Sequence, residues 1–431
     1  MLKKKLIYLE ILASLLLYGC SPSVKQTQAA AEKTTIEVET TAEAKEPEIP
    51  YIEAADSFAG GSGTEEDPYQ IATAEQLALM GKANDDWSQE YNKAYYVLTA
   101  DIQLNDVENY ENWKETPPEY QWKPVGNSFK GSFDGDGHVI SGMYVRSVKD
   151  WFGIGLFREL FTGSVSNVKI EKGYLYINDS NTYAGGVIGN IVGNVKVENC
   201  SVDMAVCSEV TNETDCVGGI VGWCQSGAVI TGCTFHGDIS YQDGCGVFGG
   251  VCGSQSIGDV MVLQREAETI HENGSAEIIN CINYGDLQTH TEDDTVGGII
   301  GNIHSSDSNV DNLKIKNCEN YGDIEGKTTT GGILGFLSIN AETEGVQIVD
   351  CINMGKLLMQ KHGRLGGILG HVDYSQKSSE NWRIENCVNT GVIQYQNGTE
   401  PFKADLKERV FEDCRTPEEK AAVIMGGSSC P

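Results

Sequence analysis

The sequence predicts an all-β protein built as a parallel β-solenoid, and three observations predict this fold class. A block of two glycines, two aliphatic residues and a third glycine recurs along the chain. A cysteine follows most copies of the block, after an aliphatic residue and usually an asparagine. Almost no segment between the helix expected near the N-terminus and Asp405 has helical periodicity. Short strands that return to one register every 33 to 37 residues are typical of stacked coils.

The glycine block by itself resembles a phosphate-binding loop, as in the stretch VGGIIGN at residues 296–302. Related blocks occur at residues 185–189, 218–222, 331–335 and 366–370, and a degenerate copy is expected at residues 245–249. Six copies make a single nucleotide loop implausible. We interpret the glycines as positions of tight turning and close stacking, with Ile299 and Ile300 marking a strand. Residues 322–328 imitate a P-loop, but one residue is missing between its glycines.

The aligned cysteines are interpreted as a column of small hydrophobic side chains inside the solenoid. They are Cys200, Cys233, Cys281, Cys318, Cys351 and Cys387, and Val168 holds the same position in an earlier repeat. Same-position residues of successive coils stack, and buried free cysteine packs as a small hydrophobe. Disulfide pairing stays open for the other cysteines, namely Cys207, Cys216, Cys224, Cys245 and Cys252, and Cys414 with Cys430.

Each repeat is expected to contain three short strands, the third in a block such as residues 285–287. One interval between cysteines is 48 residues long and holds an insertion at about residues 253–276. This insertion and exposed aromatic residues such as Tyr284 and Tyr321 are candidate determinants of ligand specificity. Simple stacking along the solenoid is the alternative for both tyrosines.

The first 19 residues are predicted to be a processing signal, with a basic start at Lys3, Lys4 and Lys5 and an apolar stretch that is too short to span a bilayer. Its end, Leu-Tyr-Gly followed by Cys20, resembles the lipobox of bacterial lipoproteins. The resemblance implies that Cys20 is lipidated and anchors the protein to a membrane. An ordinary signal peptide is the alternative.

Composition predicts the domain organisation that follows this signal. Residues 20–50 lack aromatic side chains and are expected to be a flexible tether. Residues 51–130 are expected to cap the solenoid and to contain one helix at about residues 74–84, after a capping box that begins at Thr73. The solenoid is placed at residues 131–395. Residues 396–431 are expected to form a C-terminal cap with helices at residues 405–412 and 417–425.

The repeats, together with the lead-in sequences at residues 63–71, 98–102, 122–126 and 129–138, resemble the GLUG-motif family of bacterial surface proteins. The likeness covers about residues 62–393. It implies a right-handed β-helix on exported or surface-anchored proteins that are often described as adhesins. Some members are IgA-specific metalloendopeptidases with a His-Glu-x-x-His zinc site. Here His271-Glu272 lacks the second histidine, so protease activity is not carried over.

Charge and motifs narrow the function classes further. The 62 acidic and 31 basic side chains give a net charge of −31, which argues against nucleic acid as a partner. Asp134 and Asp136 could begin a calcium loop, but Asp-Gly pairs also form turns without metal. No Cys-x-x-Cys zinc motif or serine nucleophile motif occurs, and no cofactor is expected.

The predicted function is therefore that of a non-catalytic, lipid-anchored, extracytoplasmic binding protein. We expect an adhesin that recognises a host or environmental glycan or protein. The alternatives are a polysaccharide-degrading β-helix enzyme, whose carboxylates would lie in a groove, and an envelope scaffold protein. No catalytic or metal-binding residue is identified.

Overall fold

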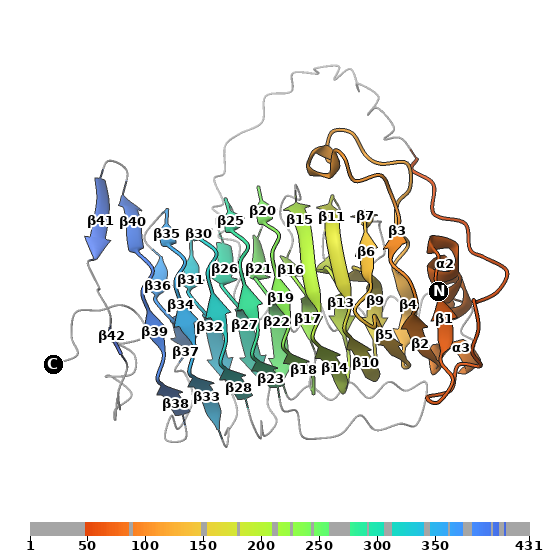
Figure 1. Cartoon of the computed structure of the whole chain (residues 1–431). Helices are drawn as coiled ribbons and strands as arrows, with labels where there is room; N and C mark the ends of the chain where they lie inside the picture. Colours follow the sequence, from red (N-terminus) through yellow and green to blue (C-terminus); the bar gives the residue numbers. More distant parts are fainter. Residues whose placement is uncertain are drawn as a thin grey trace, which may run out of the picture. The chain divides into compact units, whose positions relative to one another are not determined.

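The chain winds into a parallel β-solenoid of about seven turns, which confirms the predicted fold class (Figure 1). In this computed structural model, strands of successive coils pair in parallel and in register. The structure describes residues 48–85, 89–147, 153–178, 182–208, 214–224, 227–242, 245–257, 276–290, 293–305, 313–339, 345–360, 363–373, 382–397, 400–404 and 409–410. The predicted signal, Cys20 and the tether up to residue 47 lie outside them.

One sheet is a single run of ten parallel strands, which we call the ten-stranded sheet. They are β1 (Tyr69–Ile71), β2 (Tyr95–Leu98), β5 (Ser132–Asp134), β10 (Gly163–Ser166), β14 (Val195–Glu198), β18 (Val229–Thr231), β23 (Ala276–Ile279), β28 (Leu313–Lys316), β33 (Val346–Val349) and β38 (Trp382–Glu385). In β28, Leu313 and Ile315 are buried whereas Lys314 and Lys316 are not. This alternation is typical of a sheet with one face on the core and one in solvent.

Two further sheets continue each coil. The eight-stranded sheet contains β4 (Val125–Phe129), β9 (Phe157–Leu160), β13 (Ile188–Ile191), β17 (Val221–Cys224), β22 (Cys252–Ile257), β27 (Ile300–Ser305), β32 (Leu334–Ile339) and β37 (Leu369–Asp373). The seven-stranded sheet contains β8 (Gly153–Ile154), β12 (Tyr183–Gly185), β16 (Thr214–Gly218), β21 (Cys245–Gly249), β26 (Asp293–Gly297), β31 (Thr329–Gly331) and β36 (Arg364–Gly366).

The fourth sheet holds two parallel runs of strands, one on each side of a turn in the coil. Its strands are β3 (Ile102–Gln103), β6 (Val139–Ser141), β7 (Tyr144–Arg146), β11 (Lys169–Ile177), β15 (Ser201–Ser208), β19 (Thr234–Phe235), β20 (Ile239–Tyr241), β24 (Ile282–Asn283), β25 (Leu287–Thr289), β29 (Glu319–Asn320), β30 (Ile324–Gly326), β34 (Ile352–Asn353), β35 (Leu357–Met359), β39 (Val388–Asn389), β40 (Ile393–Asn397), β41 (Glu400–Ala404) and β42 (Arg409–Val410). A full coil thus contains up to five strands, such as β26 to β30, rather than the three expected.

Parallel stacking begins before the boundary expected at residue 131, because β1 and β2 already belong to the ten-stranded sheet. The expected helix is present as α2 (Ala74–Asp85), and α3 (Gln89–Asn92) and the short 3₁₀ helix η1 (Tyr110–Asn112) add helical segments that the sequence did not predict. A variant of the capping box forms at α2: the amide of Gln76 donates to Oγ1 of Thr73 at 3.3 Å, and Oε1 of Gln76 accepts from the amide of Ala72, one residue before Thr73, at 2.8 Å.

The glycine block is a corner between two strands. Gly297 ends β26 and Ile300 begins β27, so Gly298 and Ile299 lie in the corner. The interpretation of Ile299 as part of a strand was therefore wrong, although its side chain is fully buried. The degenerate copy at residues 245–249 was also misplaced. Gly249 pairs with Gly297, which makes residues 249–253, Gly-Gly-Val-Cys-Gly, the true and complete copy.

Buried asparagines explain why the second glycine of the corner cannot carry a side chain. A Cβ atom on Gly298 would lie 2.4 Å from Cγ of Asn320 and 2.2 Å from the carbonyl oxygen of Gly332 in the next coil. Gly250, Gly332 and Gly367 meet an asparagine in the same way. These asparagines form a column that the sequence analysis missed, and they are Asn283, Asn320, Asn353 and Asn389.

The cysteine column forms as predicted. All six cysteines are free and at most 1% exposed, and Val168 occupies the equivalent buried position. Each sulfur also lies near two backbone carbonyl oxygens, as in Cys318, whose Sγ is 3.4 Å from the carbonyl oxygens of both Ile278 and Lys316. The residue before each of these positions has a positive φ, which asparagine and glycine tolerate well. Cysteine therefore combines small apolar size with a weak donor at a sharp turn.

The other cysteines whose side chains are described are also buried and form no disulfide with one another, and they are Cys207, Cys216, Cys224 and Cys252. The sulfurs of Cys224 and Cys252 are 3.7 Å apart, but Cys252 pairs in register with Val221, three residues before Cys224. That offset along the strand does not favour a disulfide. The side chain of Cys245, and Cys414 and Cys430 entirely, lie outside the described residues.

The last coil pairs with antiparallel strands. β41 lies antiparallel to β40, and β42 lies antiparallel to β39. The helix expected at residues 405–412 is wrong at Arg409 and Val410, which form β42, and residues 417–425 lie outside the described part.

The insertion expected at about residues 253–276 is shorter than predicted, since β22 continues to Ile257 and β23 starts at Ala276. Residues 258–275 lie outside the described part.

Candidate functional site

Exposed hydrophobic side chains gather at one turn of the fourth sheet. Five large hydrophobic residues are exposed in the described part of the chain, and four of them lie at the turns that join β24 to β25 and its equivalents in later coils. Their exposed fractions are 44% for Tyr284, 37% for Tyr321, 42% for Met354 and 55% for Val392. The fifth, Tyr51, lies near the N-terminus. Exposed apolar side chains that cluster in this way mark interaction surfaces.

Two columns of side chains define this surface, which we call the turn strip. The exposed column consists of His236, Tyr284, Tyr321 and Met354, one from each of four successive coils. The acidic column lies two residues further along each turn and consists of Asp238, Asp286 and Asp323. Lys356 takes the next position of the acidic column.

The buried asparagines shape these turns. Asn283 donates from Nδ2 to Oδ1 of Asn320 at 2.7 Å and to the carbonyl oxygen of Gly285 at 2.9 Å, so it clamps its own turn and the next coil together. The residue between Asn283 and Gly285 is therefore directed outward. Gly285 is needed because a Cβ atom there would lie 1.6 Å from the carbonyl oxygen of Gly237. The Asn-x-Gly sequence thus places Tyr284 on the surface.

The rings of the exposed column stack on one another. The ring centroids of His236 and Tyr284 are 5.0 Å apart with planes inclined by 9°, and those of Tyr284 and Tyr321 are 4.9 Å apart and inclined by 19°. The stacking expected as an alternative for both tyrosines is therefore present, together with their exposure. Because the ring faces cover one another, a ligand meets mainly the ring edges and the phenol hydroxyl groups.

The acidic column is ordered by backbone hydrogen bonds. The amide of Asp286 donates to Oδ1 of Asp238 at 2.9 Å, the amide of Asp323 donates to Oδ1 of Asp286 at 2.7 Å, and the amide of Lys356 donates to Oδ1 of Asp323 at 2.8 Å. The second oxygen of each carboxylate forms no hydrogen bond with the residues that the structure describes. A row of acceptors therefore runs along the strip at the spacing of the coils, about 4.8 Å.

Like charges and burial alter the acidity of this surface. Partial burial, followed by the nearby carboxylates of Asp238 and Asp323, raises the pKa of Asp286. Burial also raises the pKa of Asp203, which lies one coil before His236, and the histidine partly offsets this rise. The hydroxyl of Tyr321 donates to Oε2 of Glu319 at 2.5 Å, and this bond raises the pKa of Tyr321. Because its proton is directed to Glu319, the hydroxyl oxygen of Tyr321 can serve a ligand as a hydrogen-bond acceptor.

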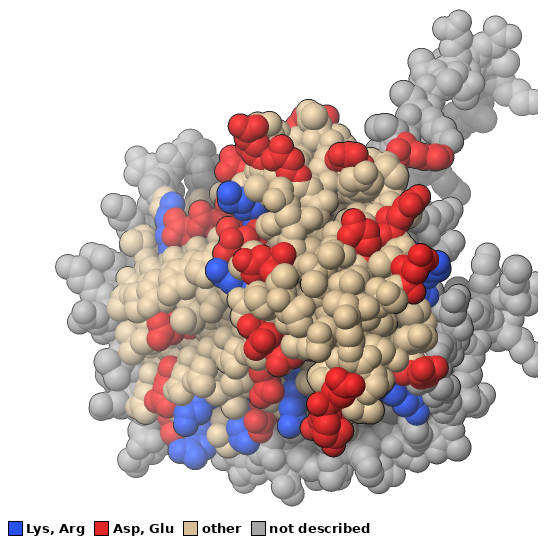
Figure 2. Space-filling model, turned by 45° about the vertical axis from the view of Figure 1, so that its right-hand side comes forward, with Lys and Arg blue, Asp and Glu red and all other residues tan. Residues whose placement is uncertain are grey.

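Acidic groups are also common elsewhere. Figure 2 shows Asp and Glu side chains spread over the face that includes the N-terminal coils, with fewer Lys and Arg side chains among them. The field over this face is therefore negative and disfavours anionic ligands. Neutral or cationic ligands are favoured at such a surface.

The other predicted site residues have structural roles. Oδ1 of Asp134 accepts hydrogen bonds from the amide of Asp136 and from Nδ2 of Asn167, each at 2.9 Å, which is the geometry of a closed turn. No group of three or more potential metal ligands occurs among the described residues. Calcium binding at Asp134 and Asp136 stays an untested alternative to a simple turn.

The segment that imitates a P-loop already holds a carboxylate. The amide of Lys327 donates to both carboxylate oxygens of Asp294, at 3.1 and 3.0 Å, and the amide of Thr328 donates to Oδ1 at 2.7 Å. The hydroxyl of Thr289 donates to the other oxygen. Asp294 is 1% exposed, so these amides serve the fold and are not open to phosphate.

Comparisons with known proteins find partial similarity. No family model matches the chain. A protein of Evansella cellulosilytica named "Putative Gly-rich membrane protein" is 30% identical over 149 residues, which are 33% of this chain and 16% of that protein. "Halomucin" of Haloquadratum walsbyi is 30% identical over 180 residues, which are 40% of this chain and 2% of that protein. The matches thus span less than a fifth of either relative.

Among solved structures, a chain described as "a putative immunoglobulin A1 protease from Bacteroides ovatus" matches with a TM-score of 0.39 and 20% sequence identity. The match covers 79% of this chain and 86% of that chain. In the part of the chain that the structure describes, no helix is long and apolar enough to cross a membrane.

Proposed function

We propose that this protein is a non-catalytic binding protein of the cell envelope, an adhesin whose turn strip binds an extended glycan chain. The observation that carries the proposal is the exposed column, in which Tyr284, Tyr321 and Met354 keep 37 to 44% of their surface in solvent on successive coils. A folded chain rarely gathers its exposed large hydrophobic side chains at one turn unless that surface binds something.

The chemistry of the strip supports a glycan as the ligand. The coils of His236, Tyr284 and Tyr321 each offer a ring edge beside the carboxylate of Asp238, Asp286 or Asp323, and sugar hydroxyl groups can bond to such polar groups. These groups repeat at the coil spacing of about 4.8 Å, so a polymer that lies along the solenoid axis can use the same contact several times. The negative surface favours a neutral or cationic polymer over an anionic one.

An envelope location is supported by the names of the two relatives, one called a membrane protein and the other Halomucin. The lipobox-like sequence before Cys20 supports attachment through a lipid on this cysteine. Metabolic labelling with a fatty acid analogue tests the anchor. The wild-type protein should incorporate label and the Cys20→Ser variant should not. Equal labelling of both would disprove the anchor at Cys20.

The binding function is tested with the full-length protein in detergent and a panel of immobilised neutral, cationic and anionic polysaccharides. The double variant Tyr284→Ser, Tyr321→Ser should lose at least about tenfold in affinity for the best ligand, because both rings belong to the contact surface. Tyr51→Ser is the matched control, since Tyr51 has the same exposed fraction as Tyr321 but lies away from the strip. Equal loss in the control and the double variant would refute the role of the strip.

The same experiment, with host proteins added to the panel, separates the alternatives. Release of reducing sugar ends during the incubation would show a polysaccharide-degrading enzyme, with carboxylates such as Asp286 as the first residues to substitute. Binding to host proteins in place of every polysaccharide would make the ligand a protein. Binding to neither would leave the envelope scaffold as the function.

A further inference from the structure

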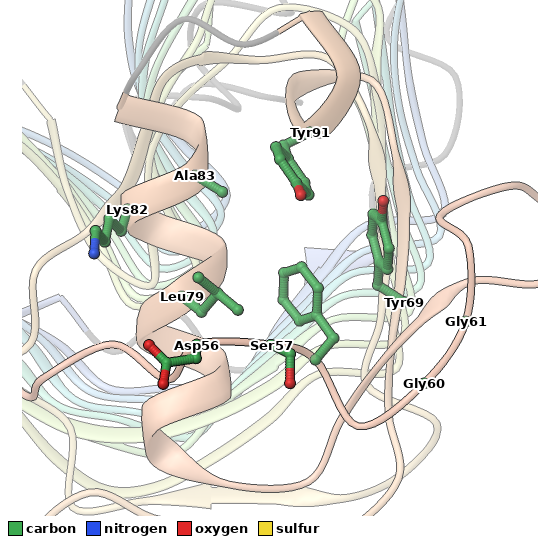
Figure 3. Close-up of a pocket in the computed structure, with 10 residues that line it drawn as sticks. Asp56, Ser57, Gly60, Gly61, Tyr69, Leu79, Lys82, Ala83 and Tyr91 are labelled. Carbon is green, nitrogen blue, oxygen red and sulfur yellow. The ribbon is translucent and has the colours of Figure 1, made fainter.

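A concave surface that is separate from the turn strip lies at the N-terminal end of the described chain. It has a volume of about 430 Å³ and is formed by α2, α3, β1 and the loop before β1 (Figure 3). Its lining residues are Asp56, Ser57, Phe58, Gly60, Gly61, Tyr69, Leu79, Lys82, Ala83 and Tyr91. We call it the N-terminal pocket. Neither the sequence analysis nor the proposed function involves it.

The inner wall of the pocket is apolar and aromatic. The rings of Phe58 and Tyr69 stack with centroids 4.7 Å apart, and the ring of Tyr91 is 5.7 Å from that of Tyr69 and 6.3 Å from that of Phe58. Leu79 and Ala83 lie on one face of α2, on the other side of the pocket (Figure 3). The rings are only partly buried, so some aromatic surface stays open to a ligand.

Polar groups border this wall. Asp56, Ser57 and Lys82 are exposed, and the hydroxyl groups of Tyr69 and Tyr91 add two donors. Within the described residues, none of these five side chains donates or accepts a hydrogen bond. Desolvation by burial raises the pKa of Tyr69, so its hydroxyl keeps its proton at neutral pH. The pocket thus combines an apolar wall with unused hydrogen-bond donors and acceptors, among them the carboxylate of Asp56 and the hydroxyl groups of Ser57, Tyr69 and Tyr91.

This combination restricts the class of ligand. A purely apolar or aromatic molecule would contact the aromatic wall but would form no hydrogen bond with Asp56, Ser57 or the two tyrosine hydroxyl groups. An inorganic ion is disfavoured because it would lie against aromatic and aliphatic carbon atoms, which cannot coordinate it. A pyranose ring fits both parts, because its C–H face can pack on aromatic side chains while its hydroxyl groups bond around the rim. The volume is at the lower end of the range typical of small-molecule sites, which suits one or two rings.

We propose that the N-terminal pocket binds a single pyranose unit, either a free monosaccharide or the end of a glycan chain. The carboxylate of Asp56 and the hydroxyl of Ser57 bond to sugar hydroxyl groups, and Phe58 and Tyr91 contact the ring. Lys82 extends from the side of α2 that faces away from Tyr91 and Tyr69 (Figure 3). This site is independent of the turn strip. Either site can exist without the other.

The test uses the full-length protein in detergent and a panel of neutral methyl pyranosides. Saturation-transfer NMR identifies a binding glycoside, and titration measures its affinity. Ala83→Phe should abolish binding because Ala83 lines the pocket and the larger phenylalanine side chain would fill it. Ala83→Ser is the matched control at the same position and should bind as the wild type does. Asp56→Asn, a change at an exposed residue that keeps its shape, should weaken binding at least about fivefold.

The outcomes distinguish this site from the turn strip. The double variant Tyr284→Ser, Tyr321→Ser should bind the glycoside normally, and Ala83→Phe should bind the extended polysaccharide normally. Absence of saturation transfer to every glycoside would overturn the pocket proposal. It would not affect the proposal that the turn strip binds a glycan chain. Binding that persists unchanged in Ala83→Phe would also overturn it, provided that circular dichroism shows the variant to be folded.

Discussion

The side-chain amide of Asn320 donates a hydrogen bond to Oδ1 of Asn353 at 2.7 Å, and neither residue has any exposed surface. The same bond joins Asn283 to Asn320 and Asn353 to Asn389. A buried amide is costly unless all of its groups are bonded, and here each asparagine side chain donates a hydrogen bond to the next one in the column. The column therefore ties four coils together from inside and sets the turns that display the strip.

Asn320→Ala should lower the free energy of unfolding by about 2–5 kcal/mol, because it leaves a cavity and removes the partners of Asn283 and Asn353. Urea unfolding followed by circular dichroism measures this loss. Tyr321→Ser, at the adjacent exposed position, is the control and should change stability by less than about 0.5 kcal/mol. Equal effects at the two positions would contradict a structural role of the asparagine column.

Gly332→Ala tests the account of the glycine corner. The added Cβ atom would lie 2.1 Å from the carbonyl oxygen of Gly367 and 2.5 Å from Cγ of Asn353, so the backbone of two coils must move apart. We expect a loss of about 3 kcal/mol or more in the free energy of unfolding. Gly137→Ala is the comparison, since nothing lies within 4 Å of its Cβ position and only its φ of 78° opposes the change. That substitution should cost about 1–2 kcal/mol.

The cysteines should be free thiols that react only after unfolding. The ten cysteines whose side chains the structure describes are buried and form no disulfide with one another, so a reagent in solution does not reach them in the folded protein. Without any reductant, mass spectrometry should therefore find little alkylation of these positions in the native protein and full alkylation in denaturant. A pair among them that is alkylated only after reduction would show a disulfide that the structure does not contain.

Asp294 should make stability depend on pH. Burial raises its pKa above the ordinary value of 3.8, although its hydrogen bonds partly oppose this. The folded state then holds the proton more tightly than the unfolded state. The contribution of Asp294 to stability should fall as the pH rises from about 3.8 through the raised pKa and stay constant above it.

The Asp294→Asn variant isolates this effect because asparagine does not titrate. The difference in free energy of unfolding, wild type minus variant, should decrease with increasing pH and then level off. Urea unfolding at several values between about pH 4 and pH 8 measures it. A difference that increases with pH would mean that the hydrogen bonds to Asp294 outweigh its burial.

The sequence predicted the solenoid because its signals are local and repeated. The glycine corners and the cysteines at intervals of 33 to 37 residues reveal the coil length, and the alternation in strands such as β28 follows from one buried face. Thr73 and Gln76 mark the start of α2 because a capping box involves only near neighbours. These features can be recognised in the sequence without knowing how successive coils pair.

The misplaced copy at residues 245–249 shows where such reasoning fails. Residues 249–253 keep all three glycines of the block and residues 245–249 keep only two, and the pairing of Gly249 with Gly297 confirms the register of the former. The N-terminal pocket was missed for a related reason. Its lining comes from four segments that have no common sequence pattern.

The sequence by itself determined the coil length, the corners, the cysteine column and the first helix, because each depends on backbone geometry within a few residues or on repetition. Only the tertiary structure decided which side chains face outward. The asparagine that follows each later cysteine by two residues is visible in the sequence, yet its burial depends on bonds to the coils on either side. Stacking those asparagines inside is what places Tyr284 and Tyr321 outside, beside the acidic column. That arrangement exists only once neighbouring coils pair.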